Sequence, residues 1–175
     1  MNNWVEIPDM TCRRCGHVTV PLFDKNCLVS IGGYEGGEGE AGYLKSVEMF
    51  DPGKEIWRKM PDMEIRRSGP GVAVGTYGNI YVYGGSNDGG TGSSSFEMID
   101  YREKQWHLLP SSTPRGYTSA CMASNFQLYV TGGIIGHSKN SACIDIFDIR
   151  MNRWFPTSKP SKLLNRNSHN CIFVL

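Results

Sequence analysis

Apolar and polar side chains alternate in three short segments of the chain that share one form. The segments are VEMFD at 47–51, FEMID at 96–100 and IDIFD at 144–148. Alternation over this length is typical of a β-strand with one buried face. Each segment ends in an Asp, and a Trp follows six residues later, at Trp57, Trp106 and Trp154. The chain therefore contains one strand motif in three copies.

A second apolar segment ends in a pair of glycines in each copy. The segments CLVSI, NIYVY and QLYVT run into Gly32-Gly33, Gly84-Gly85 and Gly132-Gly133. A Gly pair at the end of a strand favours close backbone approach or a positive φ, which a residue with a Cβ resists. An Arg lies 17 or 18 residues before each pair, at Arg14, Arg67 and Arg115, and another apolar segment follows it.

Each unit thus predicts four short strands. They are expected at 16–23, 27–33, 46–51 and 55–60 in the first unit, at 69–76, 79–85, 95–101 and 105–109 in the second, and at 117–124, 127–133, 143–149 and 153–156 in the third. The Gly-rich and Ser-rich stretches at 34–43 and 86–94 predict long surface loops. With Trp4 included, the four Trp residues are 53, 49 and 48 residues apart, a period typical of propellers and repeat arrays.

This pattern resembles the kelch repeat, in which four strands form one blade of a β-propeller. The resemblance rests on the openings Arg14-Cys15-Gly16-His17 and Arg67-Ser68-Gly69-Pro70, on the run into the Gly pair, on Ser46 to Pro52, and on the Trp. It covers essentially the whole chain. In two departures, Tyr117 replaces the opening Gly of the third unit, and Val29 stands where the other units have Tyr81 and Tyr129. The resemblance implies an all-β, kelch-type β-propeller.

The two ends of the chain predict single strands. Residues 1–10 match a fourth strand alone, and residues 163–175 begin a fourth repeat with Arg166. Full repeats are expected at roughly 11–60, 64–109 and 113–156. A propeller closes with about 4–8 blades, so we expect residues 1–175 to be an incomplete propeller of three full four-stranded blades plus an orphan strand at each end. Such a chain would be a fragment, a truncated product or one module of a larger protein.

Charge and hydropathy exclude several classes of function. The net charge is +1, with 18 basic and 17 acidic residues interspersed, so neither a nucleic-acid nor a membrane surface is expected. No apolar run approaches the roughly 18 residues needed to span a bilayer, and the first residues lack the features of a signal peptide. A cytoplasmic protein is therefore expected.

One short cluster, Cys12-Arg13-Arg14-Cys15-Gly16-His17, has the residue types of a metal or redox site. Zinc needs four ligands, and this cluster supplies three, so no metal is expected. Flanking arginines lower a thiol pKa, which makes redox sensing the better of the two special roles. The simplest interpretation is that Cys15 takes the place of Ser68 and that His17 is the His of the repeat.

The sequence gives little support to catalysis. His17, His107, His137 and His169 occupy different places in the repeats, and no nucleophile elbow or phosphate loop is present. Some kelch-fold oxidases hold copper with Tyr and His ligands, but no such pattern occurs in this chain. We therefore expect no enzyme, no catalytic residues and no cofactor, with a propeller oxidase as a remote alternative.

The repeated arginines are the candidates for partner binding. Arg14, Arg67, Arg115 and Arg166 lie in equivalent links between repeats, so they are expected around one mouth of the channel. In kelch substrate adaptors, which this chain resembles, that Arg and the residues after the Gly pair contact partner peptides. The equivalent residues after the glycines are Tyr34, Ser86, Asn87 and Ile134. The alternative is that each Arg pairs inside its own blade with Glu48, Glu97 or Asp145.

The resemblance implies a protein-interaction module that binds a protein or peptide. Its expected role is substrate recognition in a kelch-like ubiquitin-ligase adaptor, which would reach a cullin complex through domains outside this chain. An actin-binding or scaffolding kelch protein is the alternative.

Overall fold

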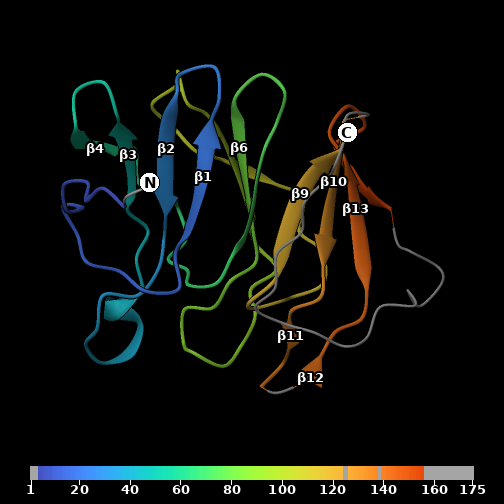
Figure 1. Cartoon of the computed structure of the whole chain (residues 1–175). Coiled ribbons are helices and arrows are strands. Elements are labelled where there is room, and N and C mark those ends of the chain that lie inside the picture. The colour runs from blue at the N-terminus through green and yellow to red at the C-terminus, as the bar shows by residue number, and fades with distance from the viewer. Residues whose placement is uncertain (1–3, 124–125, 138, 156–175) are drawn as a thin grey trace.

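The structure is a computed structural model that describes residues 4–123, 126–137 and 139–155. Three four-stranded antiparallel sheets stand side by side in it, and each is one blade (Figure 1). Blade 1 contains β1 (Val18–Leu22), β2 (Cys27–Ile31), β3 (Val47–Asp51) and β4 (Ile56–Met60). Blade 2 contains β5 (Gly71–Val74), β6 (Asn79–Tyr83), β7 (Phe96–Asp100) and β8 (His107–Leu109). Blade 3 contains β9 (Ser119–Ala123), β10 (Gln127–Thr131), β13 (Ile144–Asp148) and β14 (Arg153–Phe155).

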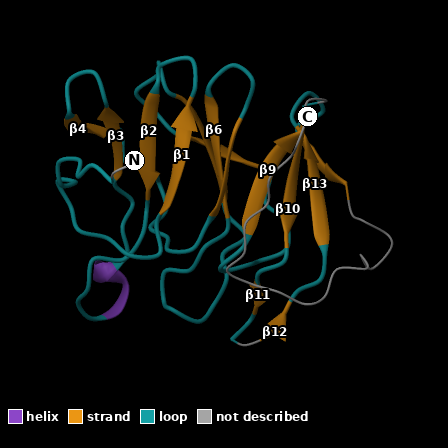
Figure 2. Cartoon of the chain, viewed as in Figure 1, coloured by secondary structure: helices purple, strands orange, loops and turns teal. Residues whose placement is uncertain are grey.

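Every blade is an antiparallel meander, and only in blade 3 does a small hairpin lie between two neighbouring strands, β10 and β13. This arrangement confirms the prediction of three four-stranded kelch-type blades. Two further elements lie in loops after the Gly pairs: the 3₁₀ helix η1 (Gly39–Gly42), and a small hairpin of β11 (Ile134–Ile135) and β12 (Lys139–Asn140) (Figure 2). The sequence predicted a loop at 34–43, where η1 lies.

The prediction of an orphan strand at the N-terminal end is wrong for the residues that the structure describes. Residues 4–10 form no strand, and Trp4 is fully exposed. A fourth strand pairs with the third strand of its own blade, and residues 4–10 pair with no strand among the described residues. The expected strand at 163–175, with Arg166, lies outside the described residues.

The blades pack face to face, and equivalent apolar side chains form both interfaces. Ile80, Ile99 and Trp106 of blade 2 pack against an apolar face of blade 1, in a cluster that includes Leu22 and Ile31. Leu128 and Phe147 of blade 3, with Trp154 beside them, pack in the same way on Tyr83 and Phe96 of blade 2. The apolar positions that alternate along each strand therefore form the interfaces between blades.

Each Trp joins its blade to the preceding segment by a hydrogen bond. The indole N–H groups of Trp57, Trp106 and Trp154 donate to the carbonyl oxygens of Pro8, Pro61 and Pro110, at 2.8, 2.9 and 2.6 Å. Trp106 is 2% exposed and packs in the apolar cluster between blades 1 and 2. A buried indole needs such an acceptor.

The Gly pairs allow two blades to approach closely. The amide of Gly33 donates to the carbonyl oxygen of Arg67 at 2.8 Å, and that of Gly85 donates to the carbonyl oxygen of Arg115 at 2.9 Å. Gly32 has φ +62°, and a Cβ there would lie 2.5 Å from the Arg67 oxygen. Both reasons for glycine, a positive φ and close approach, therefore apply at this position.

Among the described residues, no helix has the length and hydropathy required to cross a membrane.

Candidate partner-binding surface

The meander places the connections of every blade at two opposite ends. The Arg-containing links and the loops after the Gly pairs share one end, which we call the link end (residues 11–17, 32–46, 61–70, 84–95, 110–118 and 132–143). It lies at the bottom of Figure 1, where β11 and β12 are found. The short hairpin turns of each blade lie at the other end, which we call the turn end (residues 23–26, 52–55, 75–78, 101–105 and 149–152).

Arg67 shows how the repeated arginines are used. Its guanidinium donates to the carbonyl oxygens of Gly84 and Ser95, at 2.7 and 3.2 Å, and forms an ion pair with Glu97. Both side chains of this pair are 0% exposed. A planar guanidinium can bind a carboxylate and carbonyl oxygens at the same time. An ammonium group cannot bind all of these acceptors with the same geometry. Arg67 therefore ties together the ends of β6 and β7.

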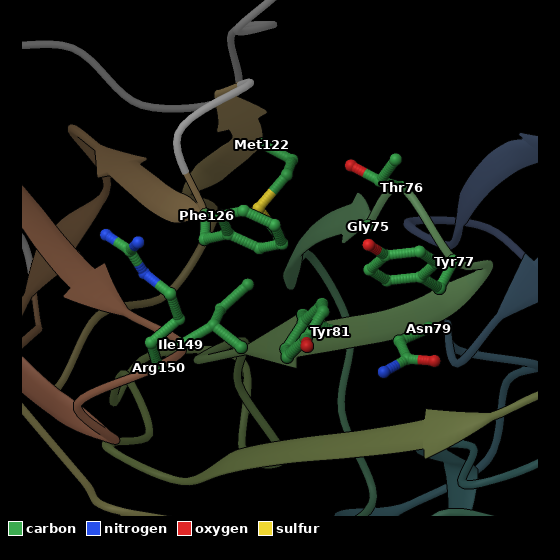
Figure 3. A pocket seen from close by; sticks show the side chains of 9 residues that line it. All are labelled: Gly75, Thr76, Tyr77, Asn79, Tyr81, Met122, Phe126, Ile149 and Arg150. Atoms are coloured by element: carbon green, nitrogen blue, oxygen red, sulfur yellow. The ribbon is translucent and has the colours of Figure 1, made fainter.

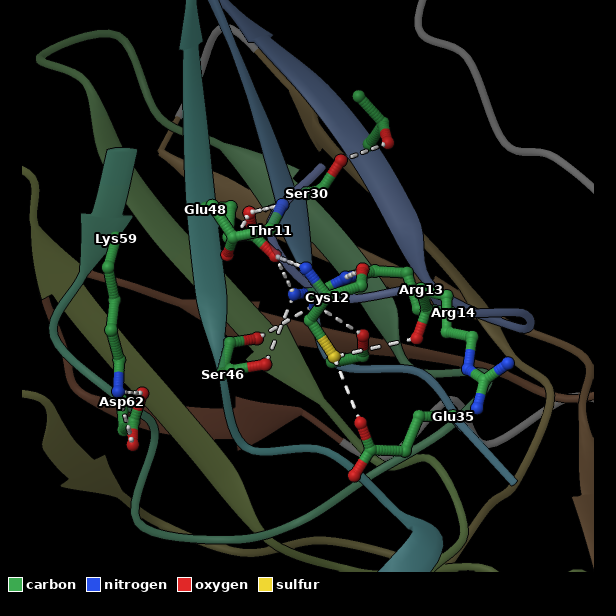
Figure 4. A network of polar contacts seen from close by, with 12 residues as sticks. Thr11, Cys12, Arg13, Arg14, Ser30, Glu35, Ser46, Glu48, Lys59 and Asp62 are labelled. Atoms are coloured by element: carbon green, nitrogen blue, oxygen red, sulfur yellow. Dashed lines mark hydrogen bonds and ion pairs between the residues drawn. The ribbon is translucent and has the colours of Figure 1, made fainter. Parts of the chain in front are cut away.

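The other two arginines repeat this arrangement. Arg14 donates to Gly32 and Ser46 and pairs with Glu48 at 2.5 Å, as part of the network in Figure 4. Arg115 donates to Gly132 and Cys143 and pairs with Asp145 at 2.7 Å. The pairing inside each blade, which was the alternative at the level of sequence, is what the structure shows.

The arginines predicted to bind a partner lie at the expected end, but their side chains turn inward. Those of Arg14, Arg67 and Arg115 are at most 1% exposed, so they offer no surface to a partner in this arrangement. Ser86 is also buried, and its hydroxyl donates to Asp88 at 2.9 Å. The three remaining candidates among the described residues are half-buried at the link end, and their contact with a partner stays a prediction: Tyr34, Asn87 and Ile134.

The carboxylates of the ion pairs differ in their surroundings. Burial alone raises the pKa of Glu48, but hydrogen bonds from Thr11 and Arg14 outweigh this effect and hold its pKa below the usual value. The backbone and hydroxyl of Thr11 both donate to Glu48, at 2.7 Å. At Asp145 the effect of burial prevails over Arg115 and raises the pKa. The pKa values of these two carboxyl groups therefore shift in opposite directions.

Sequence analysis missed two exposed arginines at the link end. Arg13 and Arg66 immediately precede the buried Arg14 and Arg67, and both are exposed. Arg66 donates to the carbonyl oxygen of Tyr43 at 3.2 Å. The signal in the sequence is the Arg-Arg doublet, in which one Arg is buried and its neighbour faces solvent. These two guanidinium groups are available to an acidic partner.

Tyr117 is a second residue whose importance only the structure reveals. It has φ +50°, close to the values of +60° and +61° at the equivalent Gly16 and Gly69. A bulky residue in this conformation is strained by about 1–3 kcal/mol, and such strain concentrates at functional sites. The ring packs directly on Gly69 of blade 2, where an added Cβ would lie 2.6 Å from it.

Further aromatic and polar groups surround the arginines at the link end. Tyr34 and Tyr43 have ring centroids 4.9 Å apart. Tyr34 lines a shallow cavity of about 340 Å³ together with Arg13, Cys15 and Glu35. Tyr and Arg are the residue types enriched in the energetic centres of protein interfaces. The link end thus has the composition of a recognition surface.

The cysteine cluster does not behave as predicted for a redox site. Burial and the nearby Glu35, which accepts a hydrogen bond from the Cys12 thiol at 3.1 Å, raise the pKa of Cys12. The Arg14 charge lowers the pKa of Cys12, as expected, but burial and Glu35 outweigh it, so the net shift is opposite to the one that a redox site needs. In the part of the chain that the structure describes, no group of three or more His, Cys, Asp and Glu side chains could hold a metal ion.

The kelch motif matches residues 13–64 and 66–113, which together are more than half of the chain. The chain therefore belongs to the kelch-repeat family. Curated relatives include Kelch-like protein 35 of Mus musculus, 28% identical over 77% of this chain, and Kelch-like protein 15 of Danio rerio, 33% identical over 70%. Kelch-like protein 23 of Homo sapiens is 27% identical over 87%. Kelch repeat domains generally bind proteins.

The chain spans only 22%, 20% and 25% of the lengths of these three relatives. Two solved structures share its fold. The structure of YjhT has a TM-score of 0.73 at 14% identity, with 89% of this chain and 58% of that chain covered. A fungal alcohol oxidase in complex with copper has a TM-score of 0.66 at 18% identity, with 87% and 32% covered. At these identities the likeness concerns the fold alone.

Proposed function

We propose that the chain recognises a partner protein through its link end and that it serves as the substrate-recognition part of a kelch-like ubiquitin-ligase adaptor. Partner recognition at the link end is supported by a contrast in burial between the two arginines of each Arg-Arg doublet. Arg67 is fully buried and holds the blade together, whereas the adjacent Arg66 is exposed on the same link. A rigid scaffold with projecting cations is suited to a partner that presents carboxylates or carbonyl oxygens.

The partner that fits this surface is an acidic peptide segment. Arg13 and Arg66 supply charge, and Tyr34 and Tyr117 supply rigid aromatic contact area at little cost in conformational entropy. Such residues contribute most when a surrounding rim excludes water from them. The loops that carry η1 and the β11–β12 hairpin extend beyond the blades at this end and provide such a rim (Figure 2).

The adaptor role is supported by the similarity to Kelch-like proteins. It is tested with the natural protein that carries this sequence, expressed in cells with an affinity tag. Captured proteins are quantified with and without inhibition of cullin-dependent ubiquitination. The adaptor role predicts a partner whose cellular amount rises on inhibition and which an Arg13→Ala/Arg66→Ala variant no longer captures.

An actin-binding or scaffolding role makes a different prediction in the same experiment. The captured partner would then keep a constant cellular amount when ubiquitination is inhibited, while capture still depends on the link end. No enzymatic activity is part of this proposal.

A further inference from the structure

A pocket at the turn end, between blades 2 and 3, lies outside the recognition surface described above. Its volume is about 200 Å³. We call it the interblade pocket; its walls are Tyr77, Asn79 and Tyr81 of blade 2 with Met122, Phe126, Ile149 and Arg150 of blade 3 (Figure 3). Pockets for drug-sized ligands have about 300–1,000 Å³, so this one suits a single ring or branched alkyl group.

The equivalent place between blades 1 and 2 is filled. Tyr101 occupies there the repeat position that Ile149 occupies in blade 3, directly after the strands FEMID (β7) and IDIFD (β13). The Tyr101 ring packs on the apolar cluster of that interface, and its hydroxyl donates to Asp24 at 2.9 Å. The shorter Ile149 does not fill the corresponding space, which stays open between the two blades.

The neighbouring arginines differ in the same way. Arg102 binds Asp100 with two hydrogen bonds of 2.8 and 2.5 Å, and this bidentate contact engages its guanidinium. The equivalent Arg150 approaches Asp148 only to 4.0 Å, and Asp148 accepts instead from the backbone amides of Arg150 and Met151. The Arg150 guanidinium therefore lies beside the pocket without a close carboxylate partner among the described residues.

Phe126 is the third departure from the repeat at this pocket. It precedes β10 as Asn26 precedes β2 and Gly78 precedes β6, and all three have positive φ, at +63°, +51° and +84°. Asn and Gly tolerate this conformation, whereas a bulky Phe is strained in it. The Phe126 ring stacks on Tyr77 with centroids 6.5 Å apart, and Arg150 lies 5.3 Å from its centre. A strained aromatic residue thus forms one wall of the pocket and supports its cation.

We propose that the interblade pocket binds a small amphipathic carboxylate. The apolar group occupies the space between Phe126 and Ile149, and the carboxylate accepts hydrogen bonds from Arg150. The open space, the guanidinium without a close carboxylate and the strained ring are three departures from the protein's own repeat, and all three meet at this pocket. A carboxylate fits because Arg150 has the planar fork that binds one with two parallel hydrogen bonds. The negative charge of Asp148 at 4.0 Å orients the guanidinium without occupying it.

The test uses the complete 175-residue chain and 3-phenylpropionate as the probe, with 3-phenylpropanamide as its neutral counterpart. Methyl NMR resonances of Ile149 and Met122 report binding. The acid is expected to shift both methyl resonances and to bind about tenfold more tightly than the amide, as one charge-assisted hydrogen-bonded contact would produce. Equal binding of acid and amide would overturn the proposal.

Three variants separate ligand binding from a structural role of these residues. Ile149→Tyr reproduces the filled interface between blades 1 and 2 and is expected to abolish the shift of Met122. Arg150→Gln is expected to remove the preference for the acid, whereas the matched control Arg153→Gln, an exposed arginine on β14, keeps it. Phe126→Gly relieves the strained φ, so it is expected to raise the melting temperature while binding is lost. Undiminished binding to Ile149→Tyr or Phe126→Gly would contradict the proposal.

Discussion

Arg67 and Glu97 form a fully buried ion pair that closes the link end of blade 2. The same guanidinium binds the carbonyl oxygens of Gly84 and Ser95, and the same carboxylate accepts from the backbone amides of Glu64 and Ile65, at 2.7 and 3.2 Å. One pair of side chains therefore fixes two strand ends and the link that follows from blade 1. This relationship makes the repeated Arg a structural residue.

Arg67→Ala should lower the free energy of unfolding by about 3–5 kcal/mol, because it leaves the Glu97 carboxylate buried without its cation. Arg67→Lys should also destabilise, since an ammonium group cannot serve the carboxylate and both carbonyl oxygens together. Urea denaturation measures both effects. The exposed neighbour provides the control, and Arg66→Ala should change stability by no more than about 0.5 kcal/mol. Equal stability of the Arg67→Ala variant and the parent would show that the pair is not structural.

Trp106→Ala should cost about 3–5 kcal/mol, since it removes a large buried ring from the interface of blades 1 and 2. Trp57→Ala should cost less, because Trp57 is only half-buried; its ring lies beside Phe50 of the same blade, with ring centroids 5.1 Å apart. Thermal denaturation compares the two variants. The same loss at both positions would mean that burial between blades does not set the contribution of the Trp.

Tyr117→Gly should raise the free energy of unfolding by about 1 kcal/mol, because glycine adopts φ +50° without strain. The same variant should weaken binding of a partner at the link end, since the ring is removed from that surface. Tyr43→Phe, which keeps the ring and its packing, serves as a comparison for the loss of a hydroxyl alone. A Tyr117→Gly protein that is less stable than the parent would indicate that the ring is needed for packing and not for recognition.

Acid should weaken the contribution of Glu48. Its pKa in the folded protein lies below the ordinary value of 4.5, so the stabilisation is fully present above about pH 4.5 and is lost as the pH falls through the folded-state pKa. Glu48→Gln should therefore be less stable than the parent at pH 7, and the difference should shrink in more acidic solution. Urea denaturation between pH 7 and pH 3 measures it, with the exposed Glu38→Gln as control. A difference that grows on acidification would contradict the assignment.

Much of the fold could be predicted because the repeat places equivalent residues in equivalent strands. The alternation in VEMFD, FEMID and IDIFD indicates β3, β7 and β13, and the positions of the Gly pairs indicate where blades approach. The separate roles of Arg66 and Arg67 could not be predicted, because a link has no periodicity that says which of two adjacent side chains turns inward. The resemblance to kelch adaptors indicated the Arg that proves to be buried as the partner-binding residue.

The interblade pocket shows a second limit of the sequence. Ile149 and Tyr101 are visibly different members of one repeat position, but an open space depends on the side chains across the interface, such as Tyr77. The sequence shows Tyr117 in place of a glycine, whereas its strain follows only from the backbone angle. Residues 1–10 match a strand motif, yet residues 4–10 pair with no strand in the part of the chain that the structure describes.

The central claim is that the exposed arginines of the link end bind an acidic segment of a partner. A displayed peptide library is selected on the 175-residue chain, and the dissociation constants of the enriched peptides are measured by isothermal titration calorimetry. The proteins compared are the parent, Arg13→Ala/Arg66→Ala, and the control Arg58→Ala, which removes an exposed Arg from the outer strand β4. We predict enrichment of acidic peptides and a loss of at least about 2 kcal/mol of binding free energy in the double variant, with no change in the control. Peptides that bind the double variant as tightly as the parent would contradict the account.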